Sequence, residues 1–215
     1  MKNSTKLIID NLIEENIELV DIKQSIMESL EILINCYNSE HKVLVCGNGG
    51  SASDSLHIVG ELVKSFKIKR TLRKDIIDKI YLTYPEEAES MINNLEGSFE
   101  AHSLVNETAL ITAFSNDKNA VFSFAQQVYS YGKKKDVLIA ISTSGNSENV
   151  VLAAKIAKLL DMTVISLTGE NKCKLDFLSD IAIKAPSRET YRIQEYHLPI
   201  YHALCASLEN EYYGE

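Results

Sequence analysis

Apolar residues recur at helical spacing through the first part of the chain. Between Lys6 and Tyr37 they return every three or four residues, and no Gly or Pro interrupts them. This spacing is typical of amphipathic helices. It predicts one long helix or a helical pair over residues 1–40, with acidic residues on the outer side.

The pattern then changes to short apolar runs that alternate with helical stretches. The run 42–46 stops at Gly47-Asn48-Gly49-Gly50, and a helical pattern continues from Ser51 to about Phe66. A β-branched run that ends in glycines indicates a buried strand entering a tight loop. Ser51 and Asp54 have the spacing of a capping box for the helix that follows.

The same strand–loop–helix order returns downstream. Strands are predicted at 136–141, 162–167 and 180–184, with a weaker one at 99–105, and helices at 148–160 and at 107–114, the latter capped by Asn106. Strands that alternate with helices predict a mostly parallel sheet covered by helices on both faces. The ligand site of such a sheet lies at the carboxyl ends of its strands.

Two stretches depart from this alternation. The last helix, about 192–212, contains Pro199, which predicts a kink or a break. We expect residues 67–97 to form a helical insertion, in which a helix begins near Pro85 and runs to about Leu95. We expect a single domain over 1–215, with the insertion lying over a site mouth or a subunit interface.

Composition narrows the class of protein. The chain is 45% hydrophobic and 24% charged, which is ordinary for a globular protein, and its net charge of −8 argues against a nucleic-acid partner. No signal-peptide core or long apolar span is present, so we expect a cytoplasmic protein with no membrane partner. Without a C-x-x-C pair, the cysteines read as buried apolar residues: Cys36, Cys46, Cys173 and Cys205.

The first loop formally matches a dinucleotide-binding fingerprint, but the acidic residue expected ~20 positions later is absent. No Lys-Ser/Thr pair follows, so it is not a P-loop either. Two interpretations remain. The loop is a tight turn that needs positive φ, or it brings backbone N–H groups and the Asn48 side chain to a polar ligand.

The second loop offers four hydroxyl groups just before a helix: Ser142, Thr143, Ser144 and Ser147. Hydroxyls, free backbone N–H groups and the positive end of a helix together suit a phosphate monoester. The alternative is an ordinary Ser/Thr-rich helix cap. The combination of a buried strand, Gly145 and four hydroxyls favours the phosphate site.

Two pairs of polar residues are candidates for chemistry. His57 and Glu61 lie four residues apart, about 40° around a helix, and Gln194 and His202 lie eight apart, about 80° around the last one. Facing each other, the pairs could bind a metal or move a proton. Singly, each of these residues is compatible with ordinary packing or exposure.

Taken in order, these motifs resemble those of the phosphoheptose isomerases of the sugar isomerase (SIS) superfamily. The likeness spans roughly 44–208 apart from 67–97, and it rests on Gly-Asn-Gly-Gly-Ser, His57-x-x-x-Glu61, Asn116-Asp117, Ser-Thr-Ser-Gly-Asn-Ser and Arg192-Ile193-Gln194-Glu195 with His202. The resemblance implies an α/β fold with a five-stranded parallel sheet flanked by helices. It also implies a homotetramer whose active sites are lined by neighbouring subunits.

The resemblance also implies a function, a sugar-phosphate aldose–ketose isomerase acting on sedoheptulose 7-phosphate through an ene-diol. Glu61 and His202 would be the acid/base pair, and zinc would be held by His57, Glu61, Gln194 and His202. The implied substrate contacts are Asn48, Gly49, Gly50, Glu61, Asn116, Asp117, Ser142, Thr143, Ser144, Ser147 and Gln194.

One alternative and one departure stay open. A non-catalytic SIS module would bind a sugar phosphate, or a protein partner such as a replication initiator, without turnover. It would have no need of an acid/base pair. After Glu61 the family tends to carry a small, a basic and then an aromatic residue, whereas here Ser65 stands at the basic position, with Lys64 before it. This difference and the insertion bear on the identity of the sugar.

Overall fold

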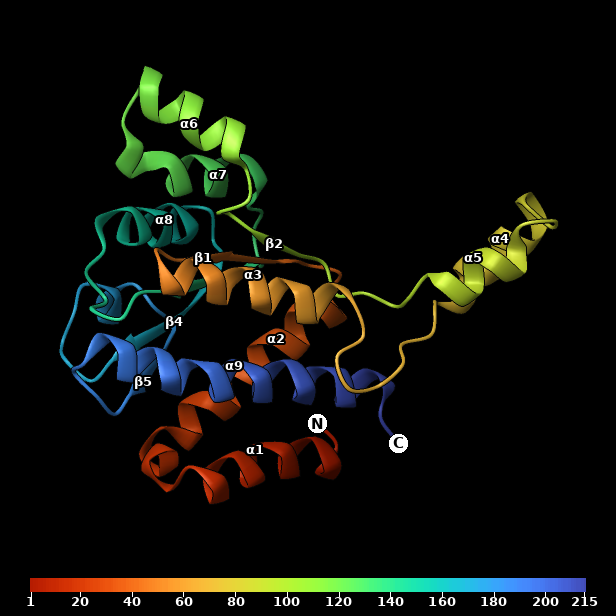
Figure 1. Ribbon diagram of the computed structural model, residues 1–215, viewed down its shortest axis with the longest axis horizontal. Coiled ribbons are helices and arrows are strands. Elements are labelled where there is room, and N and C mark those ends of the chain that lie inside the picture. Colours follow the sequence, from red (N-terminus) through yellow and green to blue (C-terminus); the bar gives the residue numbers. More distant parts are fainter.

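The computed structural model describes residues 1–215 and contains one five-stranded, all-parallel sheet (Figure 1). The strand order is β2-β1-β3-β4-β5. The strands are β1 (Val43–Cys46), β2 (Ala101–Ser103), β3 (Val137–Ile141), β4 (Thr163–Gly169) and β5 (Ile181–Ala185). The predicted α/β fold with five parallel strands is confirmed.

Helices cover both faces of the sheet. One layer consists of α1 (Asn3–Glu15), α2 (Lys23–Asn38), α3 (Gly50–Val63) and α9 (Thr190–Tyr213). The other layer consists of α7 (Ser123–Tyr131) and α8 (Glu148–Leu159), and α6 (Thr108–Asp117) lies outside it (Figure 1). Successive strand residues point to opposite faces. Accordingly Val43 and Val45 join the α1–α2–α3–α9 core, whereas Leu44 and Cys46 join the α7–α8 core.

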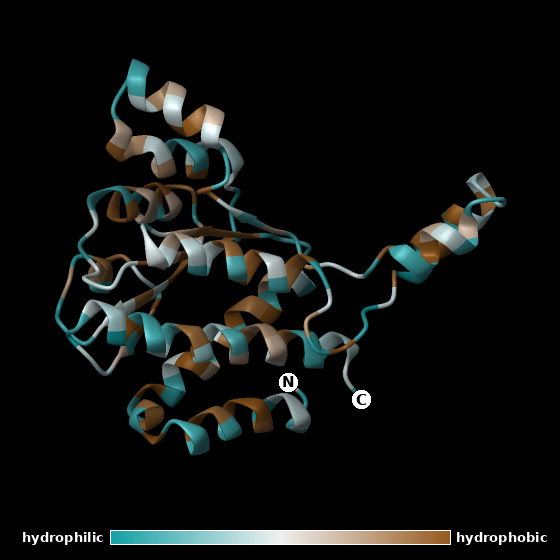
Figure 2. Ribbon diagram, in the orientation of Figure 1, coloured by the Kyte–Doolittle hydropathy of each residue, from teal (hydrophilic) through white to brown (hydrophobic).

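The N-terminal segment is a helical pair, the second of the two predicted forms. A 3₁₀ turn, Ile17–Ile22, joins α1 to α2. In Figure 2 the α1 ribbon alternates between hydrophobic and hydrophilic colours, as expected of an amphipathic helix. Its buried Ile9, Leu12 and Ile13 belong to the same core as α9.

Residues 67–97 contain two helices, where the sequence predicts only the second. These are α4 (Lys74–Thr83) and α5 (Ala88–Asn94), which pack on each other and project from the body (Figure 1). The two connecting segments are joined at their base, where Ser65 N donates to Glu96 Oε2 (2.8 Å) and Gly97 N donates to the Arg70 carbonyl (3.2 Å).

Several predicted boundaries are wrong for local reasons. The capping box does not form, because α3 begins at Gly50, Ser51 is buried in the first turn and Asp54 accepts a hydrogen bond from Tyr201 instead. The residue that caps α6 is Glu107 and not Asn106, and this helix continues to Asp117. Helix α7 and the 3₁₀ turns Ala120–Phe122 and Leu175–Phe177 were not predicted.

Helix ends also differ from the predictions. Helix α3 stops at Val63, three residues before Phe66, where the chain turns towards Glu209. Helix α9 runs unbroken through Pro199, so the break that the sequence allowed does not occur. None of the helices combines the length and the apolar character needed to cross a membrane.

Candidate active site

The first loop sits at the carboxyl end of β1 and meets the start of α9. Gly49 has φ +56°, the positive value that the tight-turn interpretation requires. A Cβ atom at Gly50 would collide with the amide of Gln194. Gly50 therefore lets the first turn of α3 approach Gln194. Gln194 thus lies at the carboxyl ends of the strands, beside the first loop.

Asn48 is held by a residue that the sequence reasoning missed. Asn48 Nδ2 donates to Asn149 Oδ1 and Asn149 Nδ2 donates to Asn48 Oδ1, both at 2.8 Å. Asn149 stands in the first turn of α8, so this amide pair joins the first loop to the second. A polar residue two positions after Ser147 was the available signal, but nothing in the sequence pairs it with Asn48.

Internal hydrogen bonds hold the second loop in place, and part of the loop is exposed. The Ser142 and Ser147 hydroxyls lie 3.0 Å apart, and Ser142 N donates to the Leu167 carbonyl (3.0 Å). Gly145, with φ +63°, packs against Cys173. Ser147 makes no capping hydrogen bond to α8, so the ordinary-cap interpretation does not describe this loop. Its exposed Ser144 and the free N–H groups of α8 suit an anion.

A second polar cluster forms between α3 and α9 around His57. His57 Nε2 lies 3.3 Å from Glu61 Oε1 and 3.5 Å from His202 Nε2. Lys64 Nζ lies 3.2 Å from the other Glu61 oxygen. The Phe66 ring covers His202, with the ring centres 5.5 Å apart. Glu61 and His202 therefore both contact the His57 imidazole, and the Glu61 residue is only 8% exposed.

Burial sets the acid–base character of this cluster. The pKa of His202 is lowered by burial first and by the neighbouring His57 second, against an opposing effect of Glu61. Burial also raises the pKa of the Tyr201 phenol, with the nearby Asp54 charge adding to the effect. His202 is thus biased towards the neutral form, and Tyr201 stays a hydrogen-bond donor.

The two groups lie at opposite ends of the sheet. Glu61 follows Gly50 by eleven residues, about 16 Å along α3. The Leu62 carbonyl accepts from Phe99 N (3.0 Å), just before β2 begins, which places Glu61 at the amino end. Within one chain, Glu61 and His202 therefore lie away from the carboxyl ends of the strands, where the sequence predicts the ligand site.

The four predicted metal ligands do not gather within one chain. Gln194 lies beside Gly50, about 12 Å along α9 from His202. No set of three or more His, Cys, Asp and Glu side chains is arranged as a metal site. The separations of 3.3 and 3.5 Å around His57 Nε2 nevertheless suit adjacent ligands of a tetrahedral ion with bonds of about 2.0–2.1 Å.

Asn116 and Asp117 lie apart from both groups. Asn116 Nδ2 donates to Asp117 Oδ1 (2.9 Å), and neither side chain bonds to a loop residue. Both are exposed at the end of α6, a helix with no buried residue. Their role as substrate contacts stays a prediction.

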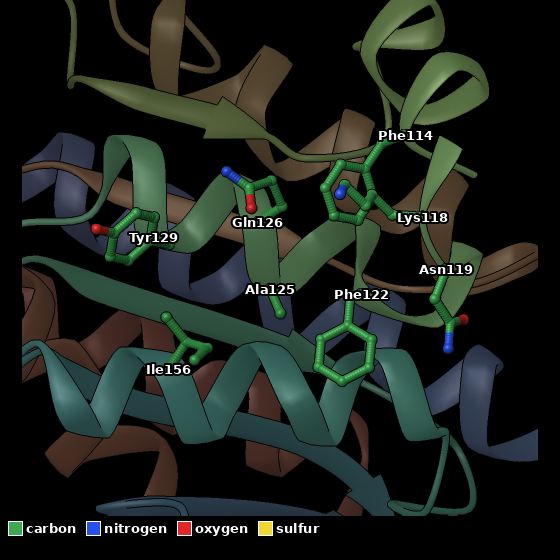
Figure 3. Close-up of a pocket in the computed structure, with 8 residues that line it drawn as sticks. All are labelled: Phe114, Lys118, Asn119, Phe122, Ala125, Gln126, Tyr129 and Ile156. Atoms are coloured by element: carbon green, nitrogen blue, oxygen red, sulfur yellow. The ribbon is translucent and has the colours of Figure 1, made fainter. Parts of the chain in front are cut away.

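A large open pocket lies elsewhere. It has a volume of about 520 Å³ and is lined by α6, α7, α8 and the segment between α6 and α7, with Phe122, Ala125 and Ile156 among its residues (Figure 3). None of the predicted site residues lines it. Five of its eight lining residues are hydrophobic, and the polar ones are Lys118, Asn119 and Gln126.

The parallel sheet with glycine and hydroxyl loops at the carboxyl ends of its strands agrees with an SIS domain, and residues 86–169 match the family model described as "SIS domain". Two relatives match almost throughout. The phosphoheptose isomerase of Helicobacter pylori strain P12 is 37% identical over 90% of this chain and 88% of its own length. That of Clostridium acetobutylicum is 35% identical over 100% and 98%.

A solved structure agrees. A phosphoheptose isomerase from Francisella tularensis is 28% identical, with a TM-score of 0.72 over 98% of this chain and 100% of its own. The chain belongs to the phosphoheptose isomerase family. The resemblance inferred from the motifs is confirmed.

Proposed function

We propose that this protein is a phosphoheptose isomerase that interconverts sedoheptulose 7-phosphate and the corresponding aldose phosphate. The observation that carries the proposal is that a chain 35–37% identical to relatives of that name keeps Glu61 and His202 in contact with the same imidazole. A protein that only binds a sugar phosphate has no need of this pair. Because phosphorylated sugars are kept inside cells, the proposed compartment is the cytoplasm.

The loop end of the sheet would hold the substrate. The Ser144 and Thr143 hydroxyls and the N–H groups at the start of α8 would bind the phosphate, which the positive helix end also favours. Asn48, Gly49 and Gln194 border the same space and would contact the sugar hydroxyls. Asn149 joins this set, because the Asn48 amide is oriented by it.

The cluster around His57 would carry the proton transfer. The Glu61 carboxylate would take a proton from C1 of the ketose while His202 gives one to the carbonyl oxygen at C2. The resulting ene-diol would then be reprotonated at C2 as the proton on the C1 oxygen is removed. The Lys64 ammonium, 3.2 Å from Glu61, holds the second carboxylate oxygen in place meanwhile.

We further propose that each site is assembled from two copies in a homotetramer. The loops of one chain lie about 16 Å along α3 from the Glu61 of the same chain. A second copy that brings its loops to the Glu61 cluster removes this separation. Symmetric assembly then produces one complete site for each chain.

Zinc fits this arrangement only in part within one chain. His57, Glu61 and His202 have suitable separations, and Gln194 of a second copy would complete the proposed ligand set. When bound, the ion would polarise the substrate carbonyl. The proton transfers assigned to Glu61 and His202 stay with those side chains.

Mixing two inactive variants tests the function and the assembly together. Glu61→Gln keeps the shape but loses the base, and should lower kcat by about 10²–10⁴. Ser144→Asp places a negative charge where the phosphate would bind. Co-refolded or co-expressed in equal amounts, the two variants should recover activity on sedoheptulose 7-phosphate at about one site in four, because random pairing joins intact halves that often.

The outcomes are distinct. Wild-type protein that turns over neither sedoheptulose 7-phosphate nor fructose 6-phosphate contradicts the isomerase and supports the non-catalytic module. An active wild type whose mixed variants recover nothing contradicts the shared site alone. A monomeric mass in solution would likewise contradict the shared site.

A further inference from the structure

His57 is hydrogen-bonded through both ring nitrogens, and the residues on its far side belong to none of the motifs on which the family resemblance rests. Its Nδ1 lies 3.1 Å from the Tyr201 hydroxyl oxygen, with the two rings edge to face. Tyr201 in turn donates to Asp54 Oδ1 at 3.3 Å. Tyr201 is only 2% exposed.

The direction of these bonds follows from the supply of protons. The phenol has a single hydrogen, and the Asp54 carboxylate can only accept, so this hydrogen points to Asp54. The phenol oxygen must then accept from His57, which places a proton on Nδ1. The Glu61 carboxylate beside Nε2 can also only accept, so Glu61 and Tyr201 compete for the single ring proton of the neutral imidazole; with that proton on Nδ1, Nε2 keeps its lone pair.

This lone pair faces the reactive side of the cluster. His57 Nε2 is the atom that lies 3.3 Å from Glu61 and 3.5 Å from His202. We propose that Tyr201, oriented by Asp54, is a positioning residue that fixes His57 as the Nδ1–H tautomer, so that Nε2 presents its lone pair between Glu61 and His202. The inference deepens the proposed function and rests on it for its kinetic consequence, but not for the tautomer itself.

The Nδ1–H tautomer of His57 leaves Nε2 free to bind a proton or a cation. An Nε2 lone pair beside a carboxylate and a second imidazole attracts a proton or a cation to that point. Hydrogen bonds to the far nitrogen of a metal-binding histidine commonly set its tautomer and strengthen it as a ligand. Here a tyrosine stands between the histidine and the carboxylate that usually makes this contact directly.

The test reads the tautomer by ¹⁵N NMR of the imidazole nitrogens in metal-free protein. The wild type should show His57 with the proton on Nδ1. Tyr201→Phe removes only the hydroxyl and should give a mixture containing the Nε2–H form. Tyr212→Phe is the matched control, since this tyrosine on the same helix donates to the Ile34 carbonyl, away from the cluster.

Two variants of Asp54 separate orientation from packing. Asp54→Asn keeps an acceptor oxygen, so Tyr201 should still point towards it and the tautomer should persist. Asp54→Ala frees the hydroxyl to turn and donate to Nδ1, which should drive His57 to the Nε2–H form. Tyr201→Phe and Asp54→Ala should also weaken zinc binding in calorimetry, and lower kcat, by about 10–100-fold relative to Tyr212→Phe.

An unchanged tautomer in Tyr201→Phe and Asp54→Ala overturns the inference. So does a changed tautomer with zinc affinity and kcat equal to those of the control. Folding is checked by the remaining histidine signals, which should match between the variants. A wild type without isomerase activity would contradict the proposed function, whereas the NMR result would still decide the tautomer.

Discussion

Ser144 is the residue through which the phosphate site is most directly tested. It is exposed on the loop before α8, and its Oγ accepts only from Asn146 N at 3.2 Å. Ser144→Ala removes one hydrogen bond of about 1.4 kcal/mol to the phosphate, so the KM for the sugar phosphate should rise about tenfold with little change in kcat. Steady-state kinetics measure this directly.

A second serine provides the control. Ser130→Ala removes an exposed hydroxyl that bonds to Gln126 on α7, away from the loops, and should leave the KM unchanged. A Ser144→Ala enzyme with the KM of the Ser130→Ala enzyme would remove the loop from the phosphate site.

At the residue scale, the sequence predicts which side chains have useful chemistry better than it predicts which of them lie close together. Hydroxyls before a helix and a His–Glu pair at helical spacing are visible in the chain, and the structure places His202 against that pair. Asn149 and Tyr201 were not predicted. Each gains its significance from a partner about 100 to 145 residues away, after two helices or two loops have packed.

At the scale of elements, a buried ion pair fixes where α3 ends. Glu209 on α9 accepts from the backbone N–H groups of Phe66, Lys67 and Ile68 and from Arg70 Nε (2.8 Å). Arg70 also donates to the Glu61 and Leu62 carbonyls, the last turn of α3. Burial alone would raise the pKa of Glu209, but these hydrogen bonds together lower it.

Arg70→Met should therefore be strongly destabilising. It leaves a buried carboxylate without its cation and two helix carbonyls without donors, which should lower the free energy of unfolding by about 3–5 kcal/mol. Urea unfolding measures the loss. Arg73→Met, which removes a largely exposed arginine, should cost less than about 1 kcal/mol. Equal losses in the two variants would contradict the role of the pair.

The helices and strands that the sequence predicted correctly are those with a clear apolar pattern. The strands and α8 follow from β-branched runs and helical spacing. Helix α7 has only nine residues, and its buried apolar residues Phe124, Ala125 and Val128 span little more than one turn, which is too short a pattern to predict a helix. The end of α3 could not be predicted, because it depends on Glu209, which lies over 140 residues later.

At the scale of the whole molecule, the sheet separates the two halves of the proposed site. The loops lie at its carboxyl edge and the His57 cluster at its amino edge, and the α4–α5 hairpin begins and ends beside this cluster (Figure 1). The residues of both halves can be identified from the sequence, but the distance between the halves cannot. The hairpin's place at a subunit interface stays a prediction, consistent with a site completed by a second copy.

Stability of the whole fold should depend on pH through His197. This side chain is fully buried, and its Nε2 donates to the Thr168 carbonyl (3.3 Å), while Nδ1 has no partner. Burial lowers the pKa of His197 from 6.5 to about 4. Between these two values the unfolded chain binds a proton that the folded chain does not.

The native state should therefore lose stability as the pH falls from about 6.5 to about 4. The difference of about 2.5 pKa units corresponds to about 3 kcal/mol, all of it present above pH 6.5. His197→Gln keeps a donor for Thr168 but does not titrate, and serves as the reference because the acidic residues affect both proteins alike. Urea unfolding from pH 7 to pH 4.5 should show the wild type losing stability faster than the variant. Parallel curves would mean that His197 is already protonated in the fold, against its complete burial.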